Sequence, residues 1–243
     1  MDECVRTLIE PKESYNLVFT GTSSEITIDF EPQLYLNKKR TYELALINLE
    51  TYYSFPNIDA TNNRFQYSKD NGLNWIPVTI PIGCYEIRAI NKEIMRQIPN
   101  KAITIKPNKN TLQSILTIAD RYIVDFTTLN CLASVLGFDK RVYKKGVHLS
   151  QHIVNILRIN SILVNCNIIT GSYLNGKEVP TIANFFPNVR PGDKIVYSPV
   201  NVIYVPVTVD VISHLTAWLT DQTHTALNLR EERLTIRLHL RER

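Results

Sequence analysis

The chain has 243 residues, of which 44% are hydrophobic and 21% are charged, so it can bury a core without disulfide or metal staples. Its formal net charge of +4 is spread along the chain instead of forming one long basic block, which argues against sequence-specific nucleic-acid binding. We expect the denser basic spots, at residues 38–40, 140–145 and 230–243, to be solvated loops and strand faces.

The first twenty residues begin acidic and contain no apolar core of a signal peptide. No stretch reaches the roughly 18 uninterrupted apolar residues of a membrane span. We therefore expect a soluble protein that is made in the cytosol and does not associate with membranes. Because all-β units routinely use this length, we expect one domain over residues 1–243, with an N-terminal arm at about residues 1–14.

Strand patterns dominate the rest of the chain. Residues 25–30 alternate polar and apolar side chains, as a half-buried strand requires, and residues 234–241 show the cleanest period of two. Further strands are predicted at residues 15–20, 42–49, 64–68, 75–80, 103–106, 114–118, 122–126, 159–169, 194–197, 202–207 and 213–220. Turn sequences such as Asp70-Asn71-Gly72 and Pro191-Gly192-Asp193 separate them. Many short strands at this spacing indicate an all-β fold, which we expect to be a single jelly-roll β-sandwich.

Two short helices are expected in insertions, where they would plug an end or flank of the sandwich. The first is predicted to begin at Asn91, a good N-cap, and to stop before Pro99. The second is predicted to be capped by Thr128 and ended by Gly137 in a left-handed conformation. Its apolar face would comprise Leu129, Leu132, Ala133 and Leu136.

The residues with catalytic chemistry form no recognisable active site. His148 and His152 have the i, i+4 spacing of a zinc hydrolase helix, but no glutamate stands between them. No His-x-His pair, glycine-rich phosphate loop or Gly-x-Ser-x-Gly elbow is present. We therefore expect no enzyme activity, no cofactor and no metal site. The four cysteines lie far apart in the sequence and are expected to be buried free thiols; they are Cys4, Cys84, Cys131 and Cys166.

Two groups of side chains are candidates for an interface between copies of the chain. The first group contains aromatic residues beside proline-bearing loops: Tyr52, Tyr53, Phe55, Phe185 and Phe186. Aromatic residues in loops are typical of a partner surface, although a loop folded back over the end of the sandwich explains them equally well. The second group is the polar face of the last strand, which carries Arg237, His239 and Arg241 and faces either solvent or a neighbouring subunit.

Six segments together resemble the single-jelly-roll minor capsid, or penton, protein of Polinton (Maverick) elements and of adintovirus-type viruses. They are NLETYYSFPNI (48–58), WIPVTIPIGCYEI (75–87), VLGF (135–138), INSILVNCNIITGSY (159–173), FPNVRPG (186–192) and LREERLTIRLHLR (229–241). The resemblance runs in one register from about residue 42 to the end of the chain. This chain differs from the family pattern at Glu231, where a glycine is usual, at Asp193, where an aromatic is usual, and at Thr223-His224, where an Asp-Gly turn is usual. If the backbone at residue 231 has a positive φ, Glu231 costs about 1 kcal/mol relative to glycine.

The resemblance implies a structural virion protein that is made in the host cytoplasm, is incorporated into the capsid there or in the nucleus, and forms rings at icosahedral vertices. Its partners would be other copies of itself, forming a pentamer, the major capsid protein, and a spike or fibre. Three alternatives stay open: part of a double-jelly-roll major capsid protein, a lectin-like ligand-binding jelly roll using exposed Trp75, Trp218 or tyrosines, and a cytokine-like trimeric jelly roll.

Overall fold

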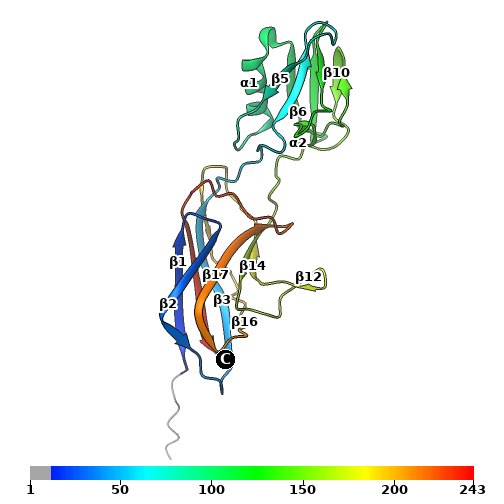
Figure 1. Ribbon diagram of the computed structural model, residues 1–243. Coiled ribbons are helices and arrows are strands. Elements are labelled where there is room, and N and C mark those ends of the chain that lie inside the picture. The colour runs from blue at the N-terminus through cyan, green and yellow to red at the C-terminus, as the bar shows by residue number, and fades with distance from the viewer. Residues whose placement is uncertain (1–11) are drawn as a thin grey trace, which may run out of the picture. The chain divides into compact units, whose positions relative to one another are not determined.

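The structure, a computed structural model, describes residues 12–243 and divides into two units (Figure 1). Unit 1 consists of residues 12–53 and 160–243, and unit 2 of Ser54–Ile159. Cys4 and most of the expected N-terminal arm lie outside the described residues. The sequence predicts one domain, whereas the chain forms a second unit between two strands of the first. Polar contacts join the first and last residues of unit 2: Arg158 pairs with Asp59 at 2.6 Å, and Asn57 Nδ2 donates to the Ile156 carbonyl at 3.1 Å. The sequence at these two ends contains no glycine- or serine-rich linker that would mark a boundary.

Unit 1 is a sandwich of two antiparallel sheets, which we call sheet 1 and sheet 2. Sheet 1 contains β1 (Ser14–Gly21), β18 (Leu234–Glu242), β3 (Tyr42–Tyr52) and β15 (Lys194–Tyr197) in that order, with the short strand β16 (Val205–Pro206) also paired to β3. Sheet 2 contains β14 (Thr181–Phe185), β11 (Ile162–Cys166), β17 (Val211–Asp221) and β2 (Glu25–Tyr35) in that order. Numbered along the chain without the short strands, the orders are 1-8-3-6 and 5-4-7-2. These interleaved orders are those of a jelly roll, so the predicted fold class is confirmed for unit 1.

The core of unit 1 follows from the period of two in its strands. In β18 the residues Leu234, Ile236, Leu238 and Leu240 are all buried, and the polar residues between them face away from the core. β1 contributes Phe19 and β17 contributes Leu215 and Leu219 to the same interior. A small hairpin, β12 (Tyr173–Leu174) and β13 (Lys177–Glu178), projects between β11 and β14.

Unit 2 contains the two α-helices found within residues 12–243 and two further sheets. One sheet has the order β5 (Ile76–Thr79), β4 (Arg64–Ser68), β8 (Ile123–Asp125), β9 (Val142–Tyr143). The other has the order β10 (Gly146–Leu149), β7 (Gln113–Ile118), β6 (Ile103–Asn108). Helix α1 (Ile87–Gln97), which is followed by a 3-10 turn at Pro99–Lys101, buries Ile87, Ile90 and Ile94 in the core of unit 2. Helix α2 (Ala133–Leu136) buries Ala133, Val135 and Leu136.

The predicted start of the first helix is wrong. The helix begins four residues before Asn91, after Glu86. Asn91 lies within the helix, and its Oδ1 accepts the backbone N–H of Ile105 at 2.7 Å, so its side chain connects α1 to β6 instead of capping a helix end. Asparagine side chains bond backbone groups both at helix N-caps and elsewhere in the fold, so the sequence alone does not distinguish an N-cap from a contact with a neighbouring strand.

The second helix is also shorter than predicted. Its N-cap is Leu132 rather than Thr128, and Leu129 is 84% exposed instead of lying on the buried face. Gly137 does end the helix in a left-handed conformation, with φ of 80°. The C-terminal half of this prediction is therefore confirmed, because it depended on a backbone conformation that favours glycine.

Several strand boundaries also differ. The strand expected at residues 159–169 is limited to β11, and only residues 205–206 of the segment 202–207 pair as a strand. Strands β9, β10 and β14 were not predicted. The first two are short and lie among lysines and arginines, and β14 carries Asn184 within an apolar run, so none has an alternation long enough to indicate a strand.

The turn at Asp70-Asn71-Gly72 is fixed by one carboxylate. Asp70 accepts hydrogen bonds from Ser68 Oγ at 2.6 Å, from the backbone N–H of Asn74 at 2.9 Å, and from Asn74 Nδ2 at 2.6 Å. These bonds, that from Ser68 first, lower the pKa of Asp70 from 3.8 to about 2. Ionised Asp70 therefore stabilises the folded chain above its ordinary pKa, and this contribution is lost as the pH falls through the folded-state value.

We expect Asp70→Ala to destabilise unit 2 most above about pH 4, with the difference from wild type shrinking as the pH falls towards about 2. Denaturant unfolding of the full chain at several pH values would measure it. Leu73→Ala, at an exposed side chain in the same turn, serves as a control with no pH dependence. A constant difference between Asp70→Ala and wild type over the whole pH range would contradict the assignment.

The backbone at Glu231 has φ of 64°, so this non-glycine residue lies in the left-handed region, as the expected cost of about 1 kcal/mol relative to glycine requires. We expect Glu231→Gly to raise the free energy of unfolding of unit 1 by up to about 1 kcal/mol, because a side chain in the left-handed region is strained. Glu232→Gly is the matched control: its φ is not positive, so the same change should lower stability by a similar amount. Equal effects of the two substitutions would show that the strain is absent.

Candidate assembly surface

The aromatic interface candidates divide into buried and exposed side chains. Phe55 is only 3% exposed, and Phe185 is buried with its ring stacked on Tyr197 at a centroid distance of 4.3 Å. Tyr53 is half-buried, and its backbone exchanges hydrogen bonds with Asp193 and Gly192. Tyr52 and Phe186 remain exposed, Phe186 by 73%. Only these last two present their rings to solvent at the surface of unit 1.

The charged interface candidates all lie on the outer face of sheet 1, but two of them have partners within the chain. Arg241 bonds Glu43 at 2.7 Å and lies over the ring of Tyr204, 3.5 Å from its centroid. His239 has both ring nitrogens occupied: Nε2 is 2.7 Å from Ser14 Oγ, and Nδ1 is 2.7 Å from the Tyr204 hydroxyl. These contacts connect the C-terminal half of β18 to β1, to β3 and to Tyr204.

Arg237 has no hydrogen-bonded or ion-paired partner among residues 12–243. It is exposed on β18, with Val18 of β1 on one side and Asn48 of β3 on the other in the strand register. Val18 is itself an exposed apolar side chain. Sheet 1 therefore presents a cation beside apolar surface, a composition that protein interfaces favour.

The other charges on the strands of sheet 1 are paired. Lys194 Nζ donates to Glu50 Oε2 at 2.5 Å, and this hydrogen bond lowers the pKa of Glu50. Arg40 bonds Glu242 at 2.6 Å. Beside the first pair lies a polar pocket of about 290 Å³, lined by residues that include Glu50, Lys194, Thr235 and Arg233. At this end of the face Arg233 and Arg237 have no ion-paired partner among residues 12–243, and the exposed Glu231 and Glu232 directly precede Arg233 in the chain.

Sheet 2 has the opposite character. Its four strands contain no lysine or arginine. The outer face of its edge strand β2 carries the exposed residues Glu25, Thr27 and Asp29, and Glu31 continues the series of exposed side chains. Thr27 bonds Thr216 of β17 at 2.8 Å, whereas the three carboxylates have no ion-paired partner in the part of the chain that the structure describes.

Sequence reasoning did not identify this acidic face as a site. The signal was present, because the alternation at residues 25–30 assigns Glu25 and Asp29 to the wet side of the strand. The sequence does not give the strand order, which places β2 in sheet 2 and β18 in sheet 1.

The residues considered for catalysis or metal binding do not come together in one site. His148 belongs to strand β10 and its Nε2 lies 2.7 Å from the Lys144 carbonyl, while His152 lies 3.1 Å from Asp139 Oδ1, so the two histidines do not share a helical face. Among residues 12–243 no group of three or more His, Cys, Asp or Glu is arranged to hold a metal ion. Within the same residues, no helix has the length and apolar character needed to cross a membrane.

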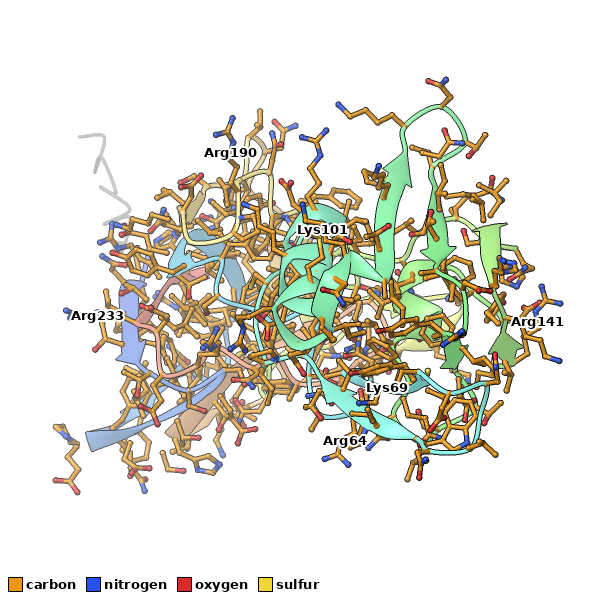
Figure 2. The ribbon with its side chains drawn as sticks, turned by 90° about the horizontal axis from the view of Figure 1, so that it is seen from above. Arg64, Lys69, Lys101, Arg141, Arg190 and Arg233 are labelled. Carbon is orange, nitrogen blue, oxygen red and sulfur yellow. The ribbon has the colours of Figure 1, made fainter. Side chains whose placement is uncertain are left out.

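The thiols and the unpaired basic residues are likewise separate. Cys131 and Cys166 are buried, as predicted, and burial raises the pKa of Cys166 to about 11, whereas Cys84 is half-buried and donates to the Phe55 carbonyl. Figure 2 shows Arg64, Lys101 and Arg141 well apart within unit 2, and Arg190 and Arg233 well apart within unit 1. Of the denser basic spots of the sequence, the segment 140–145 belongs to unit 2, whereas the segments 38–40 and 230–243 belong to unit 1 and meet where Arg40 bonds Glu242.

The architecture defines a class of protein: a jelly-roll sandwich with a second unit inserted between its third and fourth strands. The chain matches no protein-family model and no curated protein sequence. Among solved structures it is similar to the crystal structure of the mavirus penton protein, with a TM-score of 0.51 and 11% sequence identity over 95% of this chain and 100% of that chain. The likeness extends over both units, and at this identity it establishes the fold alone.

Proposed function

We propose that the chain is a structural capsid protein of the penton type, which assembles with copies of itself into a ring of five at an icosahedral vertex. The observation that carries the proposal is the jelly roll with its inserted unit, together with the likeness to a penton protein over the full length of that protein. In this role the sides of the sandwich are the working surface. No catalytic group, cofactor or metal takes part.

A ring of identical copies needs two different surfaces on each copy, which meet at every junction. Each junction must bury on the order of 1,000 Å² or more to be stable. The exposed faces of sheets 1 and 2, with Tyr52 and Phe186, supply the candidate surfaces. The major capsid protein would surround the ring, and a spike or fibre would dock onto it, so the protein would reside in the virion capsid.

A share in a double-jelly-roll major capsid protein is less well supported, because unit 2 has a four-stranded and a three-stranded sheet with two helices and not a second eight-stranded sandwich. A lectin-like domain is an alternative from a different class. Trp75, which remains exposed, would then stack on a sugar ring.

Light scattering of the purified full chain, followed by electron microscopy of any particles, tests the proposal. We expect a concentration-dependent increase in mass to that of five copies and ring-shaped particles with five-fold symmetry. A chain that stays monomeric at every concentration and ionic strength would overturn the assembly role. Binding of a glycan by such a monomer would support the lectin-like alternative instead.

A further inference from the structure

The two outer faces of the unit 1 sandwich carry unpaired charges of opposite sign. On sheet 1 the strand charges form the ion pairs Arg241–Glu43, Lys194–Glu50 and Arg40–Glu242. Arg237 has no ion pair among residues 12–243, and the acidic group whose pKa its charge lowers, Glu50, is already paired with Lys194. Arg233 lines the adjoining pocket and adds a second positive charge without an ion-paired partner there. On sheet 2 the exposed carboxylates of Glu25, Asp29 and Glu31 have no lysine or arginine on any strand of their sheet.

These faces also have the geometry that a repeating junction requires. They lie on opposite sides of one sandwich, so a copy that uses one face leaves the other free for the next copy. A contact between two identical faces would instead bring the face with Arg233 and Arg237 against its own copy, or the acidic face of β2 against its own copy, and like charges facing each other across an interface are unfavourable. Charge complementarity therefore favours the contact between unlike faces.

We infer that the acidic edge strand β2 of one copy docks against the outer face of sheet 1 of a second copy, with Glu25 and Asp29 near Arg233 and Arg237. The partner is a second copy of this chain, and the inference rests on the proposed function. The exposed side chains of Val18 and of Val196, which is 59% exposed, supply apolar surface on the same face of sheet 1. The pocket beside Arg233 gives a side chain from the second copy room to enter.

Charged residues on an edge strand have another known use, which is to prevent strand-to-strand aggregation. The two roles give opposite results on substitution. If the carboxylates of β2 only protect the edge, their removal produces larger aggregates. If they form the junction, their reversal produces smaller species.

Charge reversal on each face, alone and together, tests the inference in the full chain. We expect Arg233→Glu with Arg237→Glu to weaken association on the order of tenfold or more per junction, and Glu25→Lys with Asp29→Lys to do the same. All four substitutions in one chain should restore association, because every junction then pairs reversed charges. Lys39→Glu, at an exposed loop residue of unit 1, is the matched control and should assemble like wild type.

The readout is the mass of the particles by light scattering, with circular dichroism to confirm that each variant folds. If the wild-type chain assembles and both double variants assemble equally well, the inference is overturned and the proposed function still stands. The same holds if both double variants lose assembly and the fourfold variant does not regain it, or if reversal on β2 produces larger aggregates. A wild-type chain that never associates would overturn the proposed function itself.

Discussion

Replacement of Gly137 by alanine is expected to cost unit 2 about 3 kcal/mol of stability or more. The backbone there has φ of 80°, which strains any side chain by about 1 kcal/mol. In addition, a Cβ atom at this position would lie 2.2 Å from the His152 carbonyl oxygen and 2.9 Å from that of Ile153. Both obstacles are backbone atoms, and the Gly137 carbonyl already accepts the N–H of His152 at 2.9 Å, so relief requires the two segments to separate.

Gly72→Ala is the matched control for Gly137→Ala. Gly72 also has a positive φ, of 96°, but a Cβ there would meet only side-chain atoms at ordinary contact distances. It should therefore cost about 1 kcal/mol, the strain without the clash. Equal losses of stability for the two variants would show that the contact with His152 does not constrain the fold.

The chain offers a way to read each unit separately, because it has two tryptophans, Trp75 in unit 2 and Trp218 in unit 1. A Trp218→Phe background makes fluorescence report the denaturant unfolding of unit 2, and a Trp75→Phe background does so for unit 1. We expect Gly137→Ala to shift the unfolding midpoint reported by Trp75 much more than the midpoint reported by Trp218.

Removal of the Phe126 ring is expected to destabilise unit 2 by about 3–5 kcal/mol. Phe126 is almost fully buried, and its ring centroid lies 5.7 Å from the centroids of Phe65, Phe138 and Tyr143. These neighbours come from β4, from the residue after Gly137 and from β9, so the ring joins the segments on both sides of α2. Phe126→Ala would leave a cavity between these three rings. Because each ring is held by a different segment, we expect the rings not to move together and fill it.

Leu129→Ala provides the control for Phe126→Ala, because Leu129 lies three residues away and is largely exposed. It should change the free energy of unfolding by no more than about 0.5 kcal/mol. The single-tryptophan backgrounds again supply the measurement. A loss for Phe126→Ala below about 1.5 kcal/mol would mean that the cluster repacks around the missing ring.

The period of two predicted the jelly roll best where a strand has one wet face. The segments 25–30 and 234–241 begin at the observed first residues of β2 and β18, because a half-buried strand shows its two faces in its sequence. The end of β18 is also close to its prediction, whereas β2 continues to Tyr35. β11 was placed less accurately, since all five of its residues are buried and the apolar run around it has no period to mark its ends. The inserted unit escaped prediction, because its composition matches that of the sandwich and its ends are fixed by residues as ordinary as Asp59 and Arg158.

The candidate surface was predictable only in part. The alternation of β18 correctly assigned Arg237 to an outer face, and nothing local in the sequence could tell that Arg241 and His239 are engaged by Glu43, Ser14 and Tyr204. Their partners lie far along the chain, so their pairing depends on the strand order. The likeness of proline-flanked aromatics to interface residues was equally ambiguous, because Phe55 is buried and Phe186 is exposed.

The place of β18 in the middle of sheet 1 has a consequence for synthesis. It lies between β1 and β3 and bonds to both, and Glu13 meets Glu242 across a separation of 229 residues. Unit 2 is a continuous segment that is synthesised before residue 160, whereas β1 has no neighbour in its sheet until β18 has been synthesised. A chain that terminates before β18 lacks the centre of the sheet and Arg237, so under the assembly proposed above we expect it to be excluded from the ring.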